Sequence, residues 1–275
     1  MSYSYFLPRN ASDMLKEQQQ YKHLGLLLDK YIPKEAIEGE DKSRKGNWLR
    51  EIATSYQPDT ELIEASLARW RSYVSALHGQ AFHAKTYWRL IVGLGSNTAL
   101  ETGLTLHSLY GLPIIPGSAL KGLTRAYAAT EDTNMYLSNG KPSLKIETDP
   151  EDIQRIFGGE INKKEHAGSV IFFDAIVMNK FSLILDIMNP HYSNYYGKGD
   201  APSNDQNPIP VPFLTIKNAS FQFAVAPRDY SRQQHREDTD RAKGWLKLAL
   251  QDYGVGSKTS ADYGYFVTGE DDLLP

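Results

Sequence analysis

The stretch LPIIPGSALKGLTRAY, residues 112–127, joins a short apolar run to a predicted helix, and the rest of the chain can be interpreted outward from it. Pro116 and Gly117 end the apolar run. Ser118 is expected to cap the helix, because its hydroxyl can accept a hydrogen bond from a free backbone N–H of the first turn. At about 100° per residue, the helix has an apolar face and a cationic face. The first is formed by Leu120, Leu123 and Tyr127, and the second by Ser118, Lys121 and Arg125.

Two interpretations of the cationic face stay open from these residues alone. The free amides and the dipole of a helix N-terminus favour anions, so Lys121 and Arg125 beside that end can form a phosphate-binding site. A charged helix face is, however, more often simply solvated. The remainder of the chain has to decide between the two.

Composition limits the classes of protein that this chain can belong to. With 275 residues, of which 41% are hydrophobic, it can bury one large core or two modest ones. A net charge of −3 supplies no overall field for nucleic acid, so a polyanion must be held by a local patch or by neighbouring subunits. The absence of cysteine excludes disulfides, thiolate zinc sites and cysteine nucleophiles. With no signal peptide and no apolar run of membrane-spanning length, we expect a soluble, cytoplasmic protein without a membrane partner.

Helical patterns dominate the N-terminal third. We expect a helix over residues 15–31, a charged loop over 35–45, and a second helix capped by Asp59 or Thr60. Apolar residues of the second helix recur on one stripe: Ile63, Leu67, Trp70, Val74 and Leu77. Residues 1–84 are therefore predicted to be a helical region packed on the core.

Downstream, strands alternate with helices. Strands are expected over 86–94, 168–177, 183–188, 214–226 (with a turn at Asn218) and 265–268, and helices over 118–127, 151–157 and 238–253. This order matches the split βαβ arrangement of a ferredoxin-like (RRM-like) α+β domain with large insertions, here assigned to residues 85–275. A polar insertion is expected over 131–162, an irregular one over 189–212, and a frayed acidic tail over 270–272.

Catalytic chemistry has little support in the sequence. The seven histidines show no metal-ligand spacing, and no Gly-x-Ser-x-Gly nucleophile elbow is present. Asp174 and Asp186 could pair around magnesium, although aspartates at strand ends more often cap or form ion pairs. We therefore predict no catalytic residue, metal or cofactor. For a metal-independent nuclease, His107 and His191 are the available general acid or base.

A glycine-rich turn, GVGSKTSADYG at residues 254–264, follows the last predicted helix. Its Gly256-Ser257-Lys258-Thr259 part resembles a Walker A loop, but the spacing and the helix-to-strand context do not match, so we reject nucleotide hydrolysis. The amides and hydroxyls of such a turn can contact a phosphate backbone. A flexible connection is equally compatible with these residues.

The insertion at 189–212 is rich in aromatic residues at its start. Tyrosine rings beside cations are typical of proteins that hold an opened nucleic acid strand. The residues concerned are His191, Tyr192, Tyr195, Tyr196 and Lys198. Docking on a neighbouring subunit explains the same loop, and the two roles are compatible.

Taken together, two segments resemble the paired signatures of the RAMP superfamily of CRISPR-associated proteins: GLPIIPGSALKG at 111–122 and GVGSKTSADYGYF at 254–266. Between them, DIMNPHY at 186–192 and NPIPVPFL at 207–214 resemble the sixth subunits of type III-B (Cmr) effectors. The resemblance covers residues 86–266 in the right order and is therefore more specific than a single motif.

The resemblance implies a non-catalytic, RNA-binding subunit with a ferredoxin-like palm. Such subunits take part in antiviral defence, hold the CRISPR guide RNA toward its 3′ end and cap the row of backbone subunits. The implied partners are guide RNA, target RNA, and the backbone and small subunits of a Cmr complex. Two alternatives stay open: a metal-independent RAMP endoribonuclease that processes CRISPR transcripts through His107 or His191, and a protein-docking module without RNA contact.

The resemblance also implies which residues bind. RNA phosphates would be contacted by Gly117, Ser118, Lys121, Arg125, Gly254, Gly256, Ser257, Lys258 and Thr259. The insertion at 189–212 resembles the thumb of related backbone subunits, and its His191, Tyr192, Tyr195, Tyr196 and Lys198 would contact the guide–target duplex or other subunits. The proline- and asparagine-rich second half of this insertion departs from a simple hairpin. In a split βαβ fold, we expect the helix at 118–127 and the glycine turn to lie near the same sheet.

Overall fold

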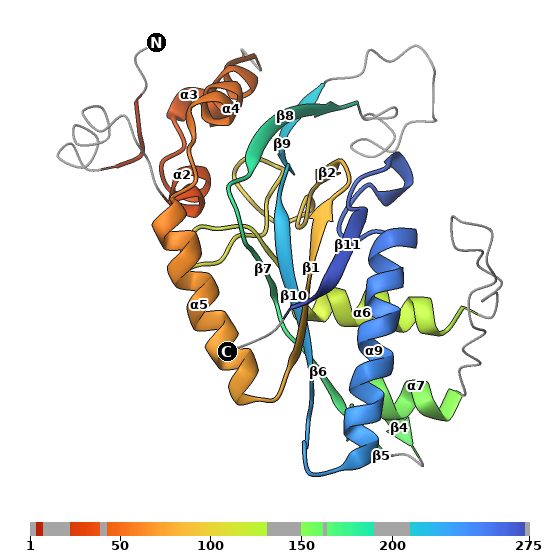
Figure 1. Cartoon of the computed structure of the whole chain (residues 1–275). Helices are drawn as coiled ribbons and strands as arrows, with labels where there is room; N and C mark the ends of the chain where they lie inside the picture. Colours follow the sequence, from red (N-terminus) through yellow and green to blue (C-terminus); the bar gives the residue numbers. More distant parts are fainter. Residues whose placement is uncertain are drawn as a thin grey trace, which may run out of the picture.

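Figure 1 shows the computed structural model of the chain, in which one antiparallel sheet lies between α5 on one side and α6, α7 and α9 on the other. The structure describes residues 4–7, 23–38, 43–130, 150–161, 164–189 and 210–272. In these ranges, every helix is too short or too polar to cross a lipid bilayer.

The main sheet has the strand order β11-β1-β10-β7-β3, and β6 pairs with β10 beside β7. Its strands are β1 (Gln80–Thr86), β3 (Ile114–Ile115), β6 (Val170–Phe172), β7 (Ala175–Val177), β10 (Ser220–Pro227) and β11 (Phe266–Asp272). The helices on its core face are α6 (Gly117–Ala128), α7 (Pro150–Phe157) and α9 (Gln233–Asp252).

The connections of this sheet confirm the predicted ferredoxin-like fold. Strands β1 and β7 lie on either side of β10, and α6 lies between them in the chain. Strands β10 and β11 lie on either side of β1, and α9 lies between them in the chain. Two interleaved split βαβ units result, with antiparallel pairing throughout.

A smaller sheet extends from the main one in the order β2-β9-β8 (Figure 1). Its strands are β2 (Arg89–Leu90), β8 (Ser182–Met188) and β9 (Val211–Lys217). Strand β9 continues into β10 through Asn218, whose φ of 58° makes the predicted turn. The pairing of β8 with β9 runs to Met188 and Val211, and residues 190–209 join their ends. Those residues, with His191 and the predicted thumb tyrosines, lie outside the described part of the chain.

The N-terminal region contains α2 (Leu24–Asp29), α3 (Lys34–Ile37), α4 (Ser43–Ser55) and α5 (Thr60–Ala76). Helix α5 confirms the predicted helix and its cap, because the Asp59 side chain accepts from the Leu62 amide at 3.2 Å. The loop predicted over 35–45 is wrong, since α3 and the start of α4 occupy much of it. The first turn of α4 is charged, but Trp48, Leu49 and Ile52 of its later turns are buried. The helical spacing of these three apolar residues was the signal in the sequence that could have predicted α4.

Three further predictions on the strands need correction. Of the strand predicted over 86–94, only Thr86 at the end of β1 and the two residues of β2 are in a strand, and β1 begins before the domain boundary expected at 84/85. The strand predicted over 168–177 is broken into β6 and β7. Asp174 lies in the break, and its carboxylate accepts a hydrogen bond from the Gly117 amide at the start of α6. The tail at 270–272 is part of β11 and not frayed, because Asp271 pairs with Lys243 and Lys247 at 2.8 and 2.6 Å.

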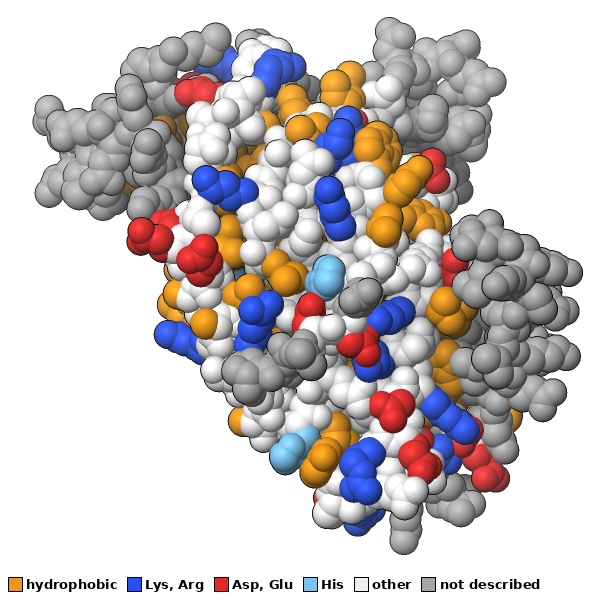
Figure 2. Space-filling view, in the orientation of Figure 1, with side chains coloured by type: hydrophobic (Ala, Val, Ile, Leu, Met, Phe, Trp, Pro, Cys, Tyr) orange, Lys and Arg blue, Asp and Glu red, His pale blue; other side chains and the backbone are white. Residues whose placement is uncertain are grey.

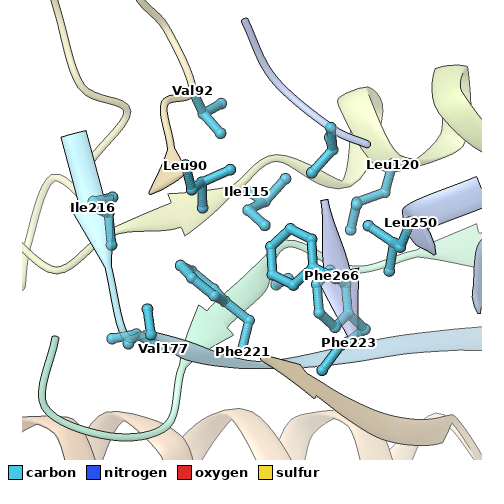
Figure 3. Close-up of a cluster of buried hydrophobic side chains, with 14 of the residues drawn as sticks. Leu90, Val92, Ile115, Leu120, Val177, Ile216, Phe221, Phe223, Leu250 and Phe266 are labelled. Atoms are coloured by element: carbon cyan, nitrogen blue, oxygen red, sulfur yellow. The ribbon is translucent and has the colours of Figure 1, made fainter. Parts of the chain in front are cut away.

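Phenylalanine rings fill the space between the sheet and its helices (Figure 3). Phe82 of β1 and Phe223 of β10 are fully buried and stack with ring centroids 5.3 Å apart. Phe266 of β11 meets Phe223 edge-on at 5.5 Å. From the helices, Leu120 and Leu250 close the same cluster. Alternate residues of β1, β10 and β11 thus make one core face, and the intervening residues face α5 or solvent.

We expect Phe223→Ala to lower the free energy of unfolding by about 3–5 kcal/mol, because it leaves a cavity where two other aromatic rings meet. Denaturant titration followed by circular dichroism measures this loss. Val267→Ala is the control, since Val267 is 58% exposed on β11 and its truncation should cost less than about 1 kcal/mol. Equal losses in the two variants would contradict this assignment of the core.

Candidate nucleic-acid interface

The N-terminus of α6 is capped from another strand. The helix begins at Gly117 after Pro116, and the Gly117 amide donates to the Asp174 carboxylate at 2.7 Å. The predicted cap is therefore wrong: Ser118 is an exposed residue inside the first turn. A Cβ at Gly117 would lie 2.3 Å from the Phe172 carbonyl oxygen, so glycine lets the helix start directly against β6. Asp174 has the capping role that is common for strand-end aspartates.

This cap changes how α6 can hold an anion. Gly117 is buried and its amide is occupied by a carboxylate, so a phosphate cannot use that donor without displacing Asp174. Anion contacts from α6 therefore depend on side chains further along the helix. Lys121 and Arg125, one and two turns into α6, are the cations available on that face.

A third cation, Arg228, lies near Lys121. Partial burial, together with the positive charges of Arg228 and Arg125, lowers the pKa of Lys121. Arg228 follows β10 and is held in place because its Nε donates to the Gly168 carbonyl at 2.6 Å. Across the described ranges, none of the three cations has a carboxylate partner. We call Lys121, Arg125 and Arg228 the α6 cluster. No sequence pattern indicated Arg228, which comes from another element.

The glycine turn is bound to β2 and the residues that follow it. The Ser257 amide donates to the Ile91 carbonyl at 2.8 Å, and the Gly264 amide donates to the Arg89 carbonyl at 2.7 Å. At Gly256 the φ is 98°, and a Cβ would lie 2.3 Å from the Ile91 oxygen, so only glycine fits. These bonds argue against a flexible connection, which was one of the two interpretations.

Among the predicted RNA contacts of this turn, the backbone amides of Gly254 and Ser257 are already hydrogen-bonded, whereas the side chain of Lys258 has no carboxylate partner among the described residues. Gly254 is buried and follows the end of α9 with a φ of 69°. Its amide donates to the Ala249 carbonyl. The Ser257 amide is occupied, which leaves its hydroxyl. Lys258 is half-buried, has a φ of 62° and carries its Nζ 5.6 Å from the centre of the Phe213 ring. Thr259 begins a 3-10 turn directly after it.

Asp186 fastens the turn to the smaller sheet. Its carboxylate pairs with Arg89 and accepts from the Tyr263 hydroxyl, and it accepts from the Ile187 amide at 2.8 Å. Burial alone would raise the pKa of Asp186, but these hydrogen bonds and the Arg89 charge outweigh it and lower the pKa. Asp186 and Asp174 thus serve separate structural contacts. In the part of the chain that the structure describes, no group of three or more potential ligands could hold a metal ion.

The α6 cluster and the glycine turn contact different elements. The cluster borders the end of β10, whereas the turn follows the C-terminal end of α9 and borders β2 (Figure 1). A contact between the two helices lies at the far end of α6, where Tyr127 meets Tyr253 edge-on with ring centroids 5.3 Å apart. The structure thus offers two separate cationic positions on one domain.

His107, a candidate general acid or base, is engaged within its own loop. Its Nδ1 accepts from the Leu109 amide at 3.2 Å, and its ring stacks on Tyr110 with centroids 4.4 Å apart. This arrangement explains His107 as a structural residue. His191 lies outside the described residues.

Comparisons with known proteins give one family and several relatives. A family model described as the RAMP superfamily matches residues 83–267. The CRISPR system Cmr subunit Cmr6 of Pyrococcus furiosus is 36% identical over 75% of this chain and 73% of its own. The Cmr6 subunit of Saccharolobus solfataricus is 25% identical over 94% of this chain and 84% of its own.

Two further matches bear on the fold and on catalysis. The Cms endoribonuclease Csm3 of Streptococcus thermophilus is 29% identical over 60% of this chain and 73% of its own. Among solved structures, a chain of the type III-B Cmr-beta complex bound to cognate target RNA aligns with a TM-score of 0.62. That alignment covers 95% of this chain and 96% of the other, and at 19% identity it shows the fold alone.

The lowered pKa of Asp186 predicts a pH dependence of stability. A carboxyl whose pKa is depressed by folding stabilises the protein above its unfolded pKa, about 3.9, and loses this contribution as the pH falls below it. We therefore expect Asp186→Asn to be less stable than the parent at pH 7, and the difference to shrink toward pH 3. Denaturant titrations across this range measure it.

Tyr263→Phe is the matched variant, because it removes one hydrogen bond to Asp186 and keeps the ring. Its stability difference from the parent should also shrink on acidification, but by less than that of Asp186→Asn. Parallel pH profiles for the parent and both variants would contradict the role given to Asp186.

Proposed function

We propose a function for this chain on the premise that it belongs to the RAMP superfamily. Its relatives are named as Cmr6 subunits, and it is a Cmr subunit of type III-B CRISPR interference. We propose that it is a non-catalytic subunit that binds the guide RNA toward the 3′ end and caps the backbone filament. Its partners would be guide RNA, target RNA, and the backbone and small subunits, in the cytoplasm.

The observation that carries this proposal is the α6 cluster. Partial burial, and after it the positive charges of Arg228 and Arg125, lowers the pKa of Lys121, so Lys121 is repelled by both arginines in the folded chain. Without a carboxylate partner among the described residues, this repulsion is relieved when an anion binds. The chain as a whole has a net charge of −3, so its cations attract a polyanion only where they gather. RNA phosphates are the anions that the family implies.

The glycine turn supplies a second contact. Its hydrogen bonds to Ile91 and Arg89 fix the backbone of the turn before any ligand arrives. A preformed contact loses less conformational entropy on binding than a mobile one. Lys258 would meet a phosphate from this fixed position, with the hydroxyls of Ser257 and Thr259 beside it. Two separate cationic positions suit an extended chain of phosphates better than a small anion.

We expect loss of the cations to weaken guide binding in a salt-dependent way. In the assembled complex, Lys121→Ala, Arg125→Ala and Lys258→Ala should each lower the salt slope of guide-RNA affinity by about 1, because each phosphate contact releases counterions. Arg228→Ala should behave in the same way. Titrations at several salt concentrations give both the affinity and the slope.

The control for these variants is Lys180→Ala. Lys180 is an exposed lysine between β7 and β8 and belongs to neither the α6 cluster nor the glycine turn. It should leave the affinity and the slope unchanged. If the four cation variants bind guide RNA with the affinity and slope of the parent, the assigned sites are wrong.

A second function, metal-independent cleavage of CRISPR transcripts, has one observation in its favour. The chain is similar to a protein named as an endoribonuclease, Csm3, over 60% of its length. Against it, His107 has its Nδ1 and its ring engaged in its own loop. We therefore propose that the chain does not cleave RNA.

Incubation of the purified chain with repeat RNA in EDTA separates the two functions. We expect the RNA to stay intact on a denaturing gel over hours. Specific cleavage that His107→Ala or His191→Ala abolishes would instead establish the endoribonuclease. Cleavage that persists in both variants would indicate a contaminating nuclease, which an independent preparation would identify.

A further inference from the structure

Two tyrosines lie side by side where β1 and β11 meet the glycine turn. The Tyr87 amide donates to the Tyr265 carbonyl at 2.8 Å, one position beyond the Thr86–Phe266 pair of the sheet. Tyr87 is 74% exposed and Tyr265 is half-buried. In the described ranges, neither ring contacts another aromatic ring.

A small cavity opens between these tyrosines and the end of α9. It has a volume of about 260 Å³ and is lined by Tyr87, Gln251, Asp262, Tyr265 and Phe266. Sites for drug-sized molecules start at about 300 Å³, so this cavity suits a smaller group. Its aromatic walls favour a planar one.

Two of the residues that line the cavity, Asp262 and Gln251, have side-chain oxygens that can accept a hydrogen bond. The Asp262 carboxylate has no hydrogen-bond or ion-pair partner within the described residues. Gln251 uses its amide nitrogen on the Thr268 hydroxyl, which leaves its carbonyl oxygen free to accept. A negative carboxylate disfavours a phosphate here. It suits a planar group that carries N–H donors on its edge, as an amino-bearing nucleobase does.

The cavity and the proposed phosphate contact share one turn of the chain. Asp262 ends the 3-10 turn that Thr259 begins, and its amide donates to the Thr259 carbonyl at 3.1 Å. The Tyr263 amide closes the same turn on the Lys258 carbonyl at 3.4 Å. One rigid turn thus holds a cation at its start and the cavity acceptor at its end. In Figure 2, Lys and Arg side chains lie next to hydrophobic ones on the face of the molecule that is in view.

We propose that Tyr87 and Tyr265 form a slot for one unpaired nucleobase of RNA, whose amino edge is bound by Asp262 and Gln251. This inference rests on the proposed function, because it assumes that RNA runs past Lys258. Stacking holds the base, and the acceptors favour adenine, cytosine or guanine over uracil, which has no amino group. The slot would thus add a preference for certain bases to the contact at Lys258, which binds phosphate regardless of the base.

The test uses the assembled complex and guide RNAs that carry 2-aminopurine at one position each, in turn. We expect strong quenching of the fluorescence at one position, where the base inserts between the tyrosines. Tyr87→Ala and Tyr265→Ala should restore the fluorescence, and Tyr87→Phe should keep it quenched because its ring still stacks. Tyr73→Ala is the control, since Tyr73 is 60% exposed on α5 and outside the slot.

Affinity measurements separate the slot from the phosphate contacts. Tyr87→Ala should weaken guide binding about 5- to 100-fold, the range for one stacked base, without changing the salt slope. Asp262→Asn should reduce the preference for an amino-bearing base over uracil at the quenched position. A slope that falls with Tyr87→Ala would show that the change disturbs phosphate contacts, and would contradict the slot.

Three other outcomes would overturn the proposal. If the tyrosine variants change neither quenching nor affinity while Lys258→Ala lowers the slope, the slot is wrong and the phosphate contacts stand. If neither set of variants has an effect, the proposed RNA-binding sites fail as well. If Tyr87→Ala only releases a neighbouring subunit from the complex, with quenching unchanged, the cavity is a protein-docking site.

Discussion

The hydrogen bond from the Gly117 amide to the Asp174 carboxylate, 2.7 Å long, joins the parts of the fold on which the site depends. It starts α6 against the sheet and coincides with the break between β6 and β7. The carbonyl of the same aspartate accepts from the Trp70 indole at 2.9 Å, so Asp174 also holds α5 on the opposite face. Because Asp174 fixes the first residue of α6 at Gly117, it also fixes where Lys121, one turn later, lies relative to the sheet.

A second constraint acts at the other cationic position. The glycine turn lies so close to Ile91 that Gly256 has no room for a side chain, and Asp186 ties Tyr263 to the smaller sheet. These contacts make the turn part of the folded scaffold, although its composition resembles that of a linker. Function on a preformed turn requires little reorganisation on binding. The stability of the fold and the geometry of the proposed binding surface are therefore linked through the same few contacts.

Regular elements with strong periodicity were predictable from the sequence. The apolar stripe of α5 repeats a local pattern several times, and α5, α9 and β8 are each present near their predicted positions. Helix α4 was missed because its first turn is charged and its apolar side is short. The end of β11 was missed because its acidic residues are stabilised by partners elsewhere in the chain: Asp271 by Lys247, and Asp272 by His83 at 2.8 Å.

By itself, the sequence determined the order of the elements, the glycines that local backbone geometry requires and the signatures shared with the RAMP superfamily. Only the tertiary structure decided which donors and charges are available. Asp174 occupies the Gly117 amide from 57 residues away, and Arg228 comes to Lys121 from the end of another strand. Local periodicity depends on neighbours within a few residues, whereas these pairings depend on how the sheet brings distant segments together. The cationic helix was therefore predictable, and its occupied N-terminus was not.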